Sequence, residues 1–235
     1  MFFIIANHPV ECAGLDRHNK VCFILGLLSL SVFDMKRVLV ILPNAFEVFE
    51  AAAFIDVLGW ANHYGDSPIE MVTAGLSAEV TCTFGGLKVT PEVLLGDVDP
   101  NDFDAVAIPG GFESEGFFED AFSESVLQTL RTFDTDQKPV ASICVGALPL
   151  GKSGILSGKQ ATTYNIMGDK RRNQLAEFGA NVVDAVIVVD DNKITSTSPA
   201  TAVDVALTLV EKLTSKENAD KVRHLMGFSD KPTVE

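Results

Sequence analysis

Short apolar runs recur along the chain, and longer stretches with helical periodicity lie between them. Ile69 to Ala74 is predicted as a strand. The runs Arg37 to Leu42 and Asp104 to Ile108 are rich in apolar and β-branched residues and show little polar alternation. This pattern is typical of strands buried on both faces of a parallel sheet. Further strands are predicted from Pro139 to Cys144, Gln160 to Thr163, Asn181 to Val183 and Val186 to Thr195, with a hairpin from Val80 to Val89. Helices are predicted over Glu47 to His63, Ser123 to Phe133, Gly168 to Phe178, Pro199 to Leu213 and Lys216 to Met226.

The alternation of strands and helices predicts an α/β fold with a mostly parallel sheet covered on both faces. With 235 residues, of which 47% are hydrophobic, the chain can bury one sizeable core, so a single main domain is expected. Ligands of such folds bind at the carboxyl ends of the strands. Three segments follow strand ends there: Pro43 to Glu50, Pro109 to Gly111, and Cys144.

The first 34 residues differ from the rest of the chain. Val21 to Phe33 is an apolar run of 13 residues preceded by Arg17, His18 and Lys20, which superficially resembles a secretory signal. The run is too short to span a bilayer comfortably, and no small-x-small cleavage site follows it. We therefore predict one domain over residues 35–235 and treat residues 1–34 as an extension or an over-extended reading frame.

Charge and cysteine content narrow the function classes. The formal net charge of −14 disfavours nucleic acid and anionic membranes as partners, because phosphate surfaces need clustered Lys and Arg. The one basic cluster, Lys170-Arg171-Arg172, is interpreted as a solvated helix face. The four cysteines show no paired spacing, which argues against a disulfide framework or a zinc site and fits a reducing cytoplasm. No G-x-G-x-x-G follows a strand, so no cofactor is expected.

Cys144 is the first candidate for chemistry. A buried strand leads into it, Gly146 follows two residues later, and Ala147 to Leu150 can begin a helix. This is the pattern of a nucleophile elbow, in which a strained turn exposes the nucleophile and helix amides face the reacting atom. The alternative is an inert buried thiol, since free Cys is among the most buried residue types.

Two further segments supply groups that could assist Cys144. Pro109-Gly110-Gly111 ends a buried strand, where glycines let backbone amides approach a ligand, so the Gly111 and Val145 amides are candidates for an oxyanion hole. An ordinary glycine turn is the alternative. Glu47 and Glu50 lie on one helical face, and one of them could share a proton with Cys144, although such acids often only complement the helix dipole.

A competing pattern is Gly146-Ala-Leu-Pro-Leu-Gly151-Lys152-Ser153, which satisfies the phosphate-loop expression G-x4-G-K-[ST]. That motif requires the lysine and serine to open a long helix. Gly154 and Gly158 interrupt the stretch after Ser153, so a P-loop ATPase is kept only as an unlikely alternative.

Three segments together resemble the ThiJ/PfpI superfamily, which includes the parkinsonism-associated protein deglycase. They are Leu-Pro-Asn-Ala-Phe-Glu-Val-Phe-Glu50, Ala-Ile-Pro-Gly-Gly111 and Ala-Ser-Ile-Cys144-Val-Gly-Ala, and the likeness runs from about Lys36 to Leu213. The resemblance implies a flavodoxin-like three-layer sandwich, usually a homodimer, with Cys144 as the reactive cysteine. It selects Glu50 as the carboxyl partner and assigns the oxyanion position to the Gly111 and Val145 amides.

The chain departs from the family pattern at two positions. Val145 stands where peptidase-like members carry a histidine, and Tyr164 stands where glyoxalase and deglycase members place one. A phenol is a poor general base at neutral pH, so proton transfer would fall to Glu50 or water. The Cys144 segment is also similar to the isocyanide hydratase branch, which uses an aspartate in place of Glu50.

Three functions remain open from the sequence. The first is a cysteine-dependent enzyme, a hydrolase or lyase, acting on a small electrophile such as an aldehyde, oxoaldehyde or isocyanide. The second is a redox-sensing or chaperone-like stress protein that uses oxidation of Cys144. The third is a non-catalytic binding module. Proteolysis by a Cys-His pair is not expected. An apolar pocket wall is suggested for Phe46, Phe49, Phe112 and Tyr164.

Overall fold

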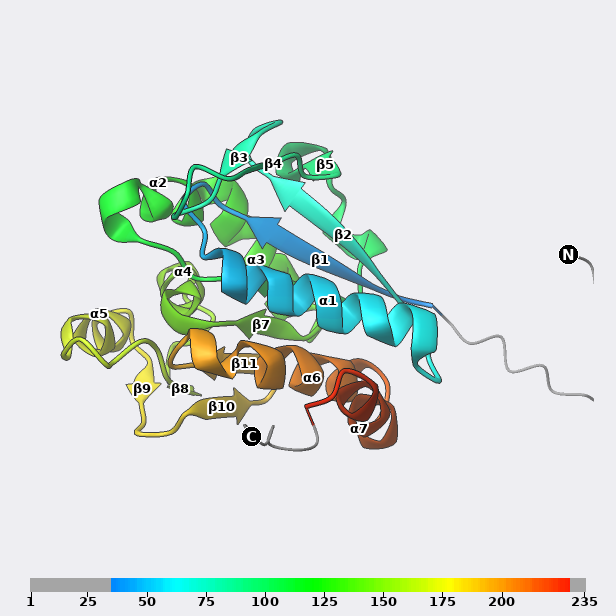
Figure 1. Cartoon of the computed structure of the whole chain (residues 1–235). Coiled ribbons are helices and arrows are strands. Elements are labelled where there is room, and N and C mark those ends of the chain that lie inside the picture. The colour runs from blue at the N-terminus through cyan, green and yellow to red at the C-terminus, as the bar shows by residue number, and fades with distance from the viewer. Residues whose placement is uncertain (1–34, 229–235) are drawn as a thin grey trace, which may run out of the picture. The chain divides into compact units, whose positions relative to one another are not determined.

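The fold is built on one sheet of seven strands. The computed structural model describes residues 35–228, and the strands follow the order β10-β11-β7-β6-β1-β2-β5 (Figure 1). Their bounds are β1 Lys36–Leu42, β2 Ile69–Gly75, β5 Val93–Leu94, β6 Ala105–Ile108, β7 Val140–Ser142, β10 Ile187–Asp190 and β11 Lys193–Ser196. All neighbouring strands pair in parallel except β10 and β11. The predicted mostly parallel sheet is confirmed.

Helices cover both faces of this sheet. Helices α1 (Val48–Tyr64), α6 (Ala202–Leu213) and α7 (Lys216–Leu225) pack together in front of the sheet in Figure 1. Helix α3 (Glu124–Thr135) packs against β6 and β7 on the other face, with α4 (Ala147–Ser153) beside it. The short helices α2 (Phe117–Ala121) and α5 (Lys170–Glu177) contact α3 and α4 respectively. The predicted flavodoxin-like three-layer sandwich is therefore confirmed.

The burial of the central strands explains why their sequences read as continuous apolar runs. Val38, Leu39, Val40 and Ile41 of β1 are all fully buried, because β1 lies between β2 and β6 and has helices on both faces. A strand in this position has no solvent face on which polar residues could alternate. Strand β1 is also where the chain's strand order reverses direction, since β2 and β6 flank it on opposite sides.

The predicted strand from Val186 to Thr195 is wrong as a single element. The segment is an antiparallel hairpin in which β10 pairs with β11, and the turn between them holds Asp191 at φ 53°. Asp and Asn tolerate the left-handed conformation that tight hairpin turns require. The run Asp190-Asp191-Asn192 was therefore the turn signal that separates the two strands.

Two small sheets lie beside the main one. Strands β3 (Val80–Thr81) and β4 (Lys88–Val89) form the predicted hairpin, whereas β8 (Gln160–Ala161) and β9 (Asn181–Val182) pair with each other in parallel outside the main sheet. The two-residue strand β5 and the five-residue helix α2 were not predicted from the sequence. Elements this short carry too few residues to show a periodicity.

The phosphate-loop alternative is contradicted by the local structure. Residues Ala147–Ser153 form helix α4, which ends at Gly154, so Lys152 and Ser153 close a helix where the motif needs them to open one. Lys152 instead lies over the rings of Phe122 and Phe178. The amides of this segment are therefore engaged in the helix and cannot cradle a nucleotide phosphate.

No helix within residues 35–228 is long and apolar enough to cross a membrane. The apolar run Val21 to Phe33, and the prediction that residues 1–34 stand apart from the domain, lie outside the described residues.

Candidate active site

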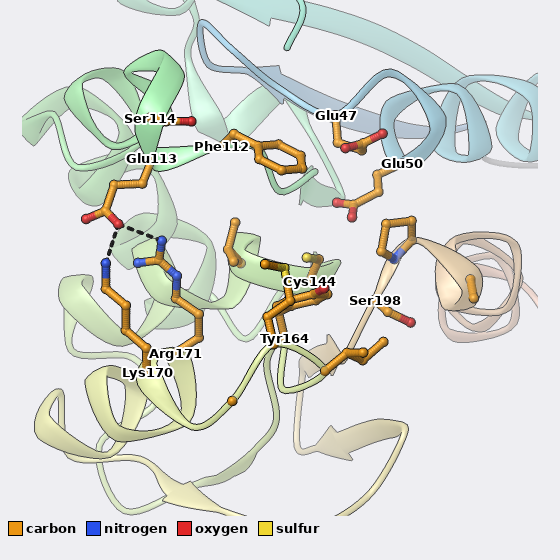
Figure 2. Close-up of a pocket in the computed structure, with 17 residues that line it drawn as sticks. Glu47, Glu50, Phe112, Glu113, Ser114, Cys144, Tyr164, Lys170, Arg171 and Ser198 are labelled. Carbon is orange, nitrogen blue, oxygen red and sulfur yellow. Dashed lines mark hydrogen bonds and ion pairs between the residues drawn. The ribbon is translucent and has the colours of Figure 1, made fainter. Parts of the chain in front are cut away.

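One pocket of about 580 Å³ lies where the carboxyl ends of β1, β6 and β7 meet. These three strands are neighbours in the sheet, so the segments that follow them converge beside the point where the strand order reverses. The pocket lining includes every candidate catalytic residue from the sequence: Glu50, Gly111, Cys144, Val145 and Tyr164. Figure 2 shows Glu50 and Cys144 facing each other within it.

The backbone turns sharply at Cys144, as the sequence predicted. Ile143 is extended, Cys144 adopts φ 55°, and a 3-10 turn over Cys144–Gly146 leads into α4. A non-glycine residue at positive φ is strained and persists only where its surroundings hold it. The buried Thr163 hydroxyl helps to do so, because it donates to the Cys144 carbonyl at 2.9 Å. A Cβ at position 146 would lie 2.8 Å from the Ile108 carbonyl oxygen, which explains Gly146.

Glu50 is fully buried in the first turn of α1. Its Oε2 accepts a hydrogen bond from the Gly110 amide at 2.6 Å, while its buried Oε1 has no hydrogen-bond partner among residues 35–228. Figure 2 shows its carboxyl pointing into the pocket toward Cys144. An unpaired buried oxygen beside a thiol is available to a ligand or to an oxidised sulfur.

Burial raises the pKa of Glu50 to about 8, and nearby Glu47 adds to the rise, whereas the Gly110 amide and the Cys144 thiol oppose it. Glu50 is therefore protonated at neutral pH. A buried carboxylic acid of this kind can donate a proton or a hydrogen bond at a pH where an exposed glutamate is charged.

Burial also raises the pKa of Cys144, and a charged Glu50 raises it further, while the Val145 amide lowers it. Burial and the carboxyl charge outweigh the effect of the Val145 amide at the start of the helix. The repulsion from Glu50 acts only when Glu50 is ionised. The two groups therefore titrate as a coupled pair, whose first proton is lost near the pKa of Glu50.

Gly111 lines the pocket. No acceptor for its N–H is found among residues 35–228. An isolated antiparallel β-bridge to Phe46 holds the backbone at Gly111. A Cβ at Gly111 would lie 2.3 Å from both the Ala45 carbonyl oxygen and the Phe117 ring, so only glycine fits. The Val145 amide is directed at the Cys144 sulfur, and Gly111 lines the same pocket.

The remaining wall combines predicted and unpredicted residues. Phe112 and Tyr164 line the pocket as expected, but Phe46 is buried away from it and Phe49 is 57% exposed outside it. Sequence reasoning missed the segment Ser198–Ala200, which joins β11 to α6 and closes one side.

The basic cluster is not simply a solvated helix face. Lys170 and Arg171 line the pocket, and both pair with Glu113, which the sequence did not single out (Figure 2). Only Arg172 behaves as expected, pairing with the exposed Asp184. The link to Glu113 joins residues far apart in the chain, so no local pattern could have revealed it.

Neither a metal centre nor a Cys-His pair is formed by the described residues. No group of three or more His, Cys, Asp or Glu side chains within residues 35–228 could hold a metal ion. Within residues 35–228 no histidine lines the pocket, and His63 lies in the last turn of α1. Proton transfer at Cys144 therefore has Glu50 as its nearest titratable partner within the described pocket.

The sequence and the structure of the chain both match known proteins. The model of the DJ-1/PfpI family matches residues 36–212. Among curated proteins, the chain is 34% identical over 191 residues to Protein dj-1beta of Drosophila melanogaster, which covers 80% of this chain and 94% of that protein. It is 30% identical over 201 residues to Protein DJ-1 homolog A of Arabidopsis thaliana, covering 85% of this chain but only 48% of that protein.

Other relatives carry names that describe activity or physiology. The chain is 32% identical over 166 residues to the Putative cysteine protease YraA of Bacillus subtilis, covering 70% of this chain and 90% of that protein. It is 37% identical over 116 residues to General stress protein 18 of the same species, covering 49% of this chain and 63% of that protein.

Solved structures agree with the fold. The crystal structure of Drosophila melanogaster DJ-1beta superimposes with a TM-score of 0.71 at 32% identity, covering 82% of this chain and 97% of that one. The structure of oxidized DJ-1 from Toxoplasma gondii superimposes with a TM-score of 0.69 at 27% identity, covering 83% of this chain and all of that one.

Proposed function

The chain belongs to the DJ-1/PfpI family, and from this premise we propose that it is a cysteine-dependent enzyme acting on small electrophiles, with Cys144 as the nucleophile. The observation that carries the proposal is the pairing of the strained Cys144 with the buried Glu50 in one pocket. A thiol held at positive φ beside a carboxyl of raised pKa is an arrangement suited to nucleophilic catalysis.

The first step is addition of sulfur to an electrophilic carbon. The Cys144 sulfur forms a bond to the carbonyl carbon of an aldehyde or oxoaldehyde, and the carbonyl π electrons move to oxygen. The thiol proton of Cys144 passes to Glu50 when that carboxyl is ionised. The proton therefore stays within the Glu50–Cys144 pair and is not released to solvent. Nothing is oxidised or reduced in this step.

The negative oxygen that forms needs donors already in place. The Gly111 amide has no acceptor among residues 35–228, and the Val145 amide lies beside the sulfur, so both can donate to that oxygen. Glu50 then returns its proton to the oxygen and gives a neutral thiohemiacetal. In an oxoaldehyde, transfer of the thiohemiacetal C–H proton to the adjacent carbonyl carbon gives a thioester, and water then cleaves the thioester to a hydroxy acid and the free thiol. An isocyanide carbon is attacked by the same sulfur.

Turnover tests this proposal directly. Purified protein is assayed with methylglyoxal and with a small isocyanide, alongside Cys144→Ala and Cys144→Ser. Loss of product formation in both variants, with unchanged folding by circular dichroism, supports the proposal. Equal turnover by Cys144→Ala, or none by the wild type on either class of electrophile, contradicts it.

A second candidate is a stress-response role in which Cys144 is oxidised. It is favoured by the protonated Glu50 and its unpaired Oε1, which could hydrogen-bond a sulfenate or sulfinate oxygen. The names General stress protein 18 and oxidized DJ-1 belong to relatives and suggest this chemistry here. In the step, sulfur attacks one oxygen of hydrogen peroxide, the O–O bond breaks, and water leaves after protonation. Selective oxidation of Cys144 without turnover would favour this role.

The proposal also covers the type of reaction and the oligomeric state of the protein. Proteolysis is not proposed, because Val145 follows Cys144 directly and the described pocket supplies no histidine. A cytoplasmic homodimer is proposed from the family resemblance, and light scattering of the purified chain tests the dimer. If Cys144 neither turns over electrophiles nor reacts with peroxide, a non-catalytic binding module is left.

A further inference from the structure

A charged triad lies at the edge of the same pocket. Lys170 and Arg171, at the start of α5, both donate to Oε2 of Glu113, and the Arg171 Nη2 distance is 2.9 Å. All three side chains line the pocket that contains Cys144 (Figure 2). Two cations share one carboxylate here, so this edge carries a positive charge in a chain whose formal net charge is −14.

Arg171 is held in place independently of Glu113. Its guanidinium carbon lies 5.0 Å from the centre of the Phe118 ring, and its Nη1 donates to Gln174 at 3.0 Å. Only 15% of the Arg171 side chain is exposed. A guanidinium fixed by stacking and by one hydrogen bond presents its remaining N–H donors in a set direction, as planar recognition of a carboxylate or phosphate requires.

The Glu113 carboxylate, which pairs with Lys170 and Arg171, can be displaced by another anion. It begins the exposed 3-10 turn Glu113–Glu115, and half of its side chain is accessible. Lys170 and Arg171 lower the pKa of Glu113, so it is ionised at neutral pH. Exposed ion pairs contribute little net stability, and an incoming anion can therefore replace the Glu113 carboxylate on the two cations without much loss.

We propose that Lys170 and Arg171 form an anion subsite, and that the electrophile which reacts at Cys144 carries a carboxylate or phosphate group away from its reacting carbon. This inference rests on the proposed function of Cys144. The bound Glu113 carboxylate marks where the anionic group lies. Phe112, Tyr164 and Ile166 line the pocket and contact the apolar part of the ligand.

Two maleimides of equal length test the subsite without knowledge of the substrate. Maleimidohexanoate carries a terminal carboxylate and maleimidohexanamide a neutral amide, and the thiol of Cys144 adds across the ring double bond of either. The second-order labelling rate of Cys144 is measured by peptide mass spectrometry, and the ratio of anionic to neutral rates reports the subsite. The wild type is expected to favour the anionic probe.

Variants separate direct binding of the probe's carboxylate by Lys170 and Arg171 from the effect of the protein's overall charge. Lys170→Met and Arg171→Gln are each expected to lower the ratio about tenfold, since a charge-assisted contact is lost. Arg172→Gln removes the same charge from the same helix outside the pocket and should leave the ratio unchanged. Glu113→Gln should raise the ratio, because it removes the competing carboxylate; a purely structural Glu113 would lower it.

The outcomes show separately whether the anion subsite or the proposed reactivity of Cys144 fails. A wild-type ratio of one, a ratio unaffected by Lys170→Met and Arg171→Gln, or a lower ratio in Glu113→Gln overturns the anion subsite while leaving Cys144 reactive. Failure of the neutral probe to label Cys144 at all counts against the proposed function itself. Competition of the anionic probe by inorganic phosphate or by acetate then identifies which anion the subsite prefers.

Discussion

The Glu50 carboxyl lies against the Cys144 thiol in a buried pair, although one follows strand β1 and the other follows β7. The sheet order places β6 between those strands, and the Gly110 amide that follows β6 holds the Glu50 carboxyl from the same side. Burial keeps a proton on this pair at neutral pH. The reactivity of the site therefore depends on where that proton resides.

Substituting Glu50 should change how stability depends on pH. The pKa of Glu50 rises from 4.5 in the unfolded chain to about 8 in the folded protein. Between these values the folded protein binds a proton that the unfolded chain has lost, so stability is full below pH 4.5 and falls as pH rises through 8. The total loss is on the order of a few kcal/mol.

Glu50→Gln removes this dependence and keeps a side-chain oxygen for the Gly110 amide. We expect the variant to be more stable than wild type at pH 9 and similar to it at pH 5, measured by denaturant unfolding at both values. Glu177→Gln, on the outer helix α5, serves as the control. Parallel stability curves for wild type and Glu50→Gln would contradict the buried, protonated carboxyl.

The Thr163 hydroxyl should help to hold the strained backbone turn at Cys144. Thr163→Val removes the buried hydrogen bond to the Cys144 carbonyl and leaves that oxygen unpaired, which costs about 1–3 kcal/mol. Labelling of Cys144 by iodoacetamide should slow, and Thr163→Ser should restore it. The matched control Thr208→Val loses a hydroxyl bonded to the Asp204 carbonyl within α6 and should leave labelling unchanged. Equal labelling in Thr163→Val and wild type would show that the hydroxyl does not position the thiol.

Tyr164 should matter less than Glu50. If the carboxyl transfers the proton, Tyr164→Phe should keep turnover within a few-fold of wild type, whereas Glu50→Gln should lower it by a factor on the order of 100 or more. The measurement is kcat with the electrophile that the wild type turns over fastest. A loss in Tyr164→Phe as large as that in Glu50→Gln would assign proton transfer to the phenol.

The sequence revealed those parts of the fold whose signals are local. The central strands β1 and β6 are buried on both faces, so they appear as apolar runs, and Cys144 stands where such a run meets a glycine and a helix start. Because parallel strands end at one edge, Glu50, Gly111 and Cys144 could be expected to converge.

The features that escaped prediction depend on distant partners. Nothing near Lys170 and Arg171 indicates that Glu113 will meet them at the pocket. The raised pKa of Cys144 comes from burial and from Glu50, neither of which is visible in the residues around the elbow. The hairpin turn at Asp191 was a local signal, but it was outweighed by the apolar residues on both sides of it.

The most direct test of the central claim is the rate at which iodoacetamide alkylates Cys144 as a function of pH, in wild type and Glu50→Gln, with Cys144→Ser as the background. We predict that the wild-type rate rises and levels off near pH 8, where the pair loses its first proton. In Glu50→Gln this levelling-off should disappear, so that alkylation keeps rising above pH 8 and becomes faster than in wild type, because no carboxylate charge opposes the thiolate. Superimposable profiles for the two proteins would contradict a proton shared between Glu50 and Cys144.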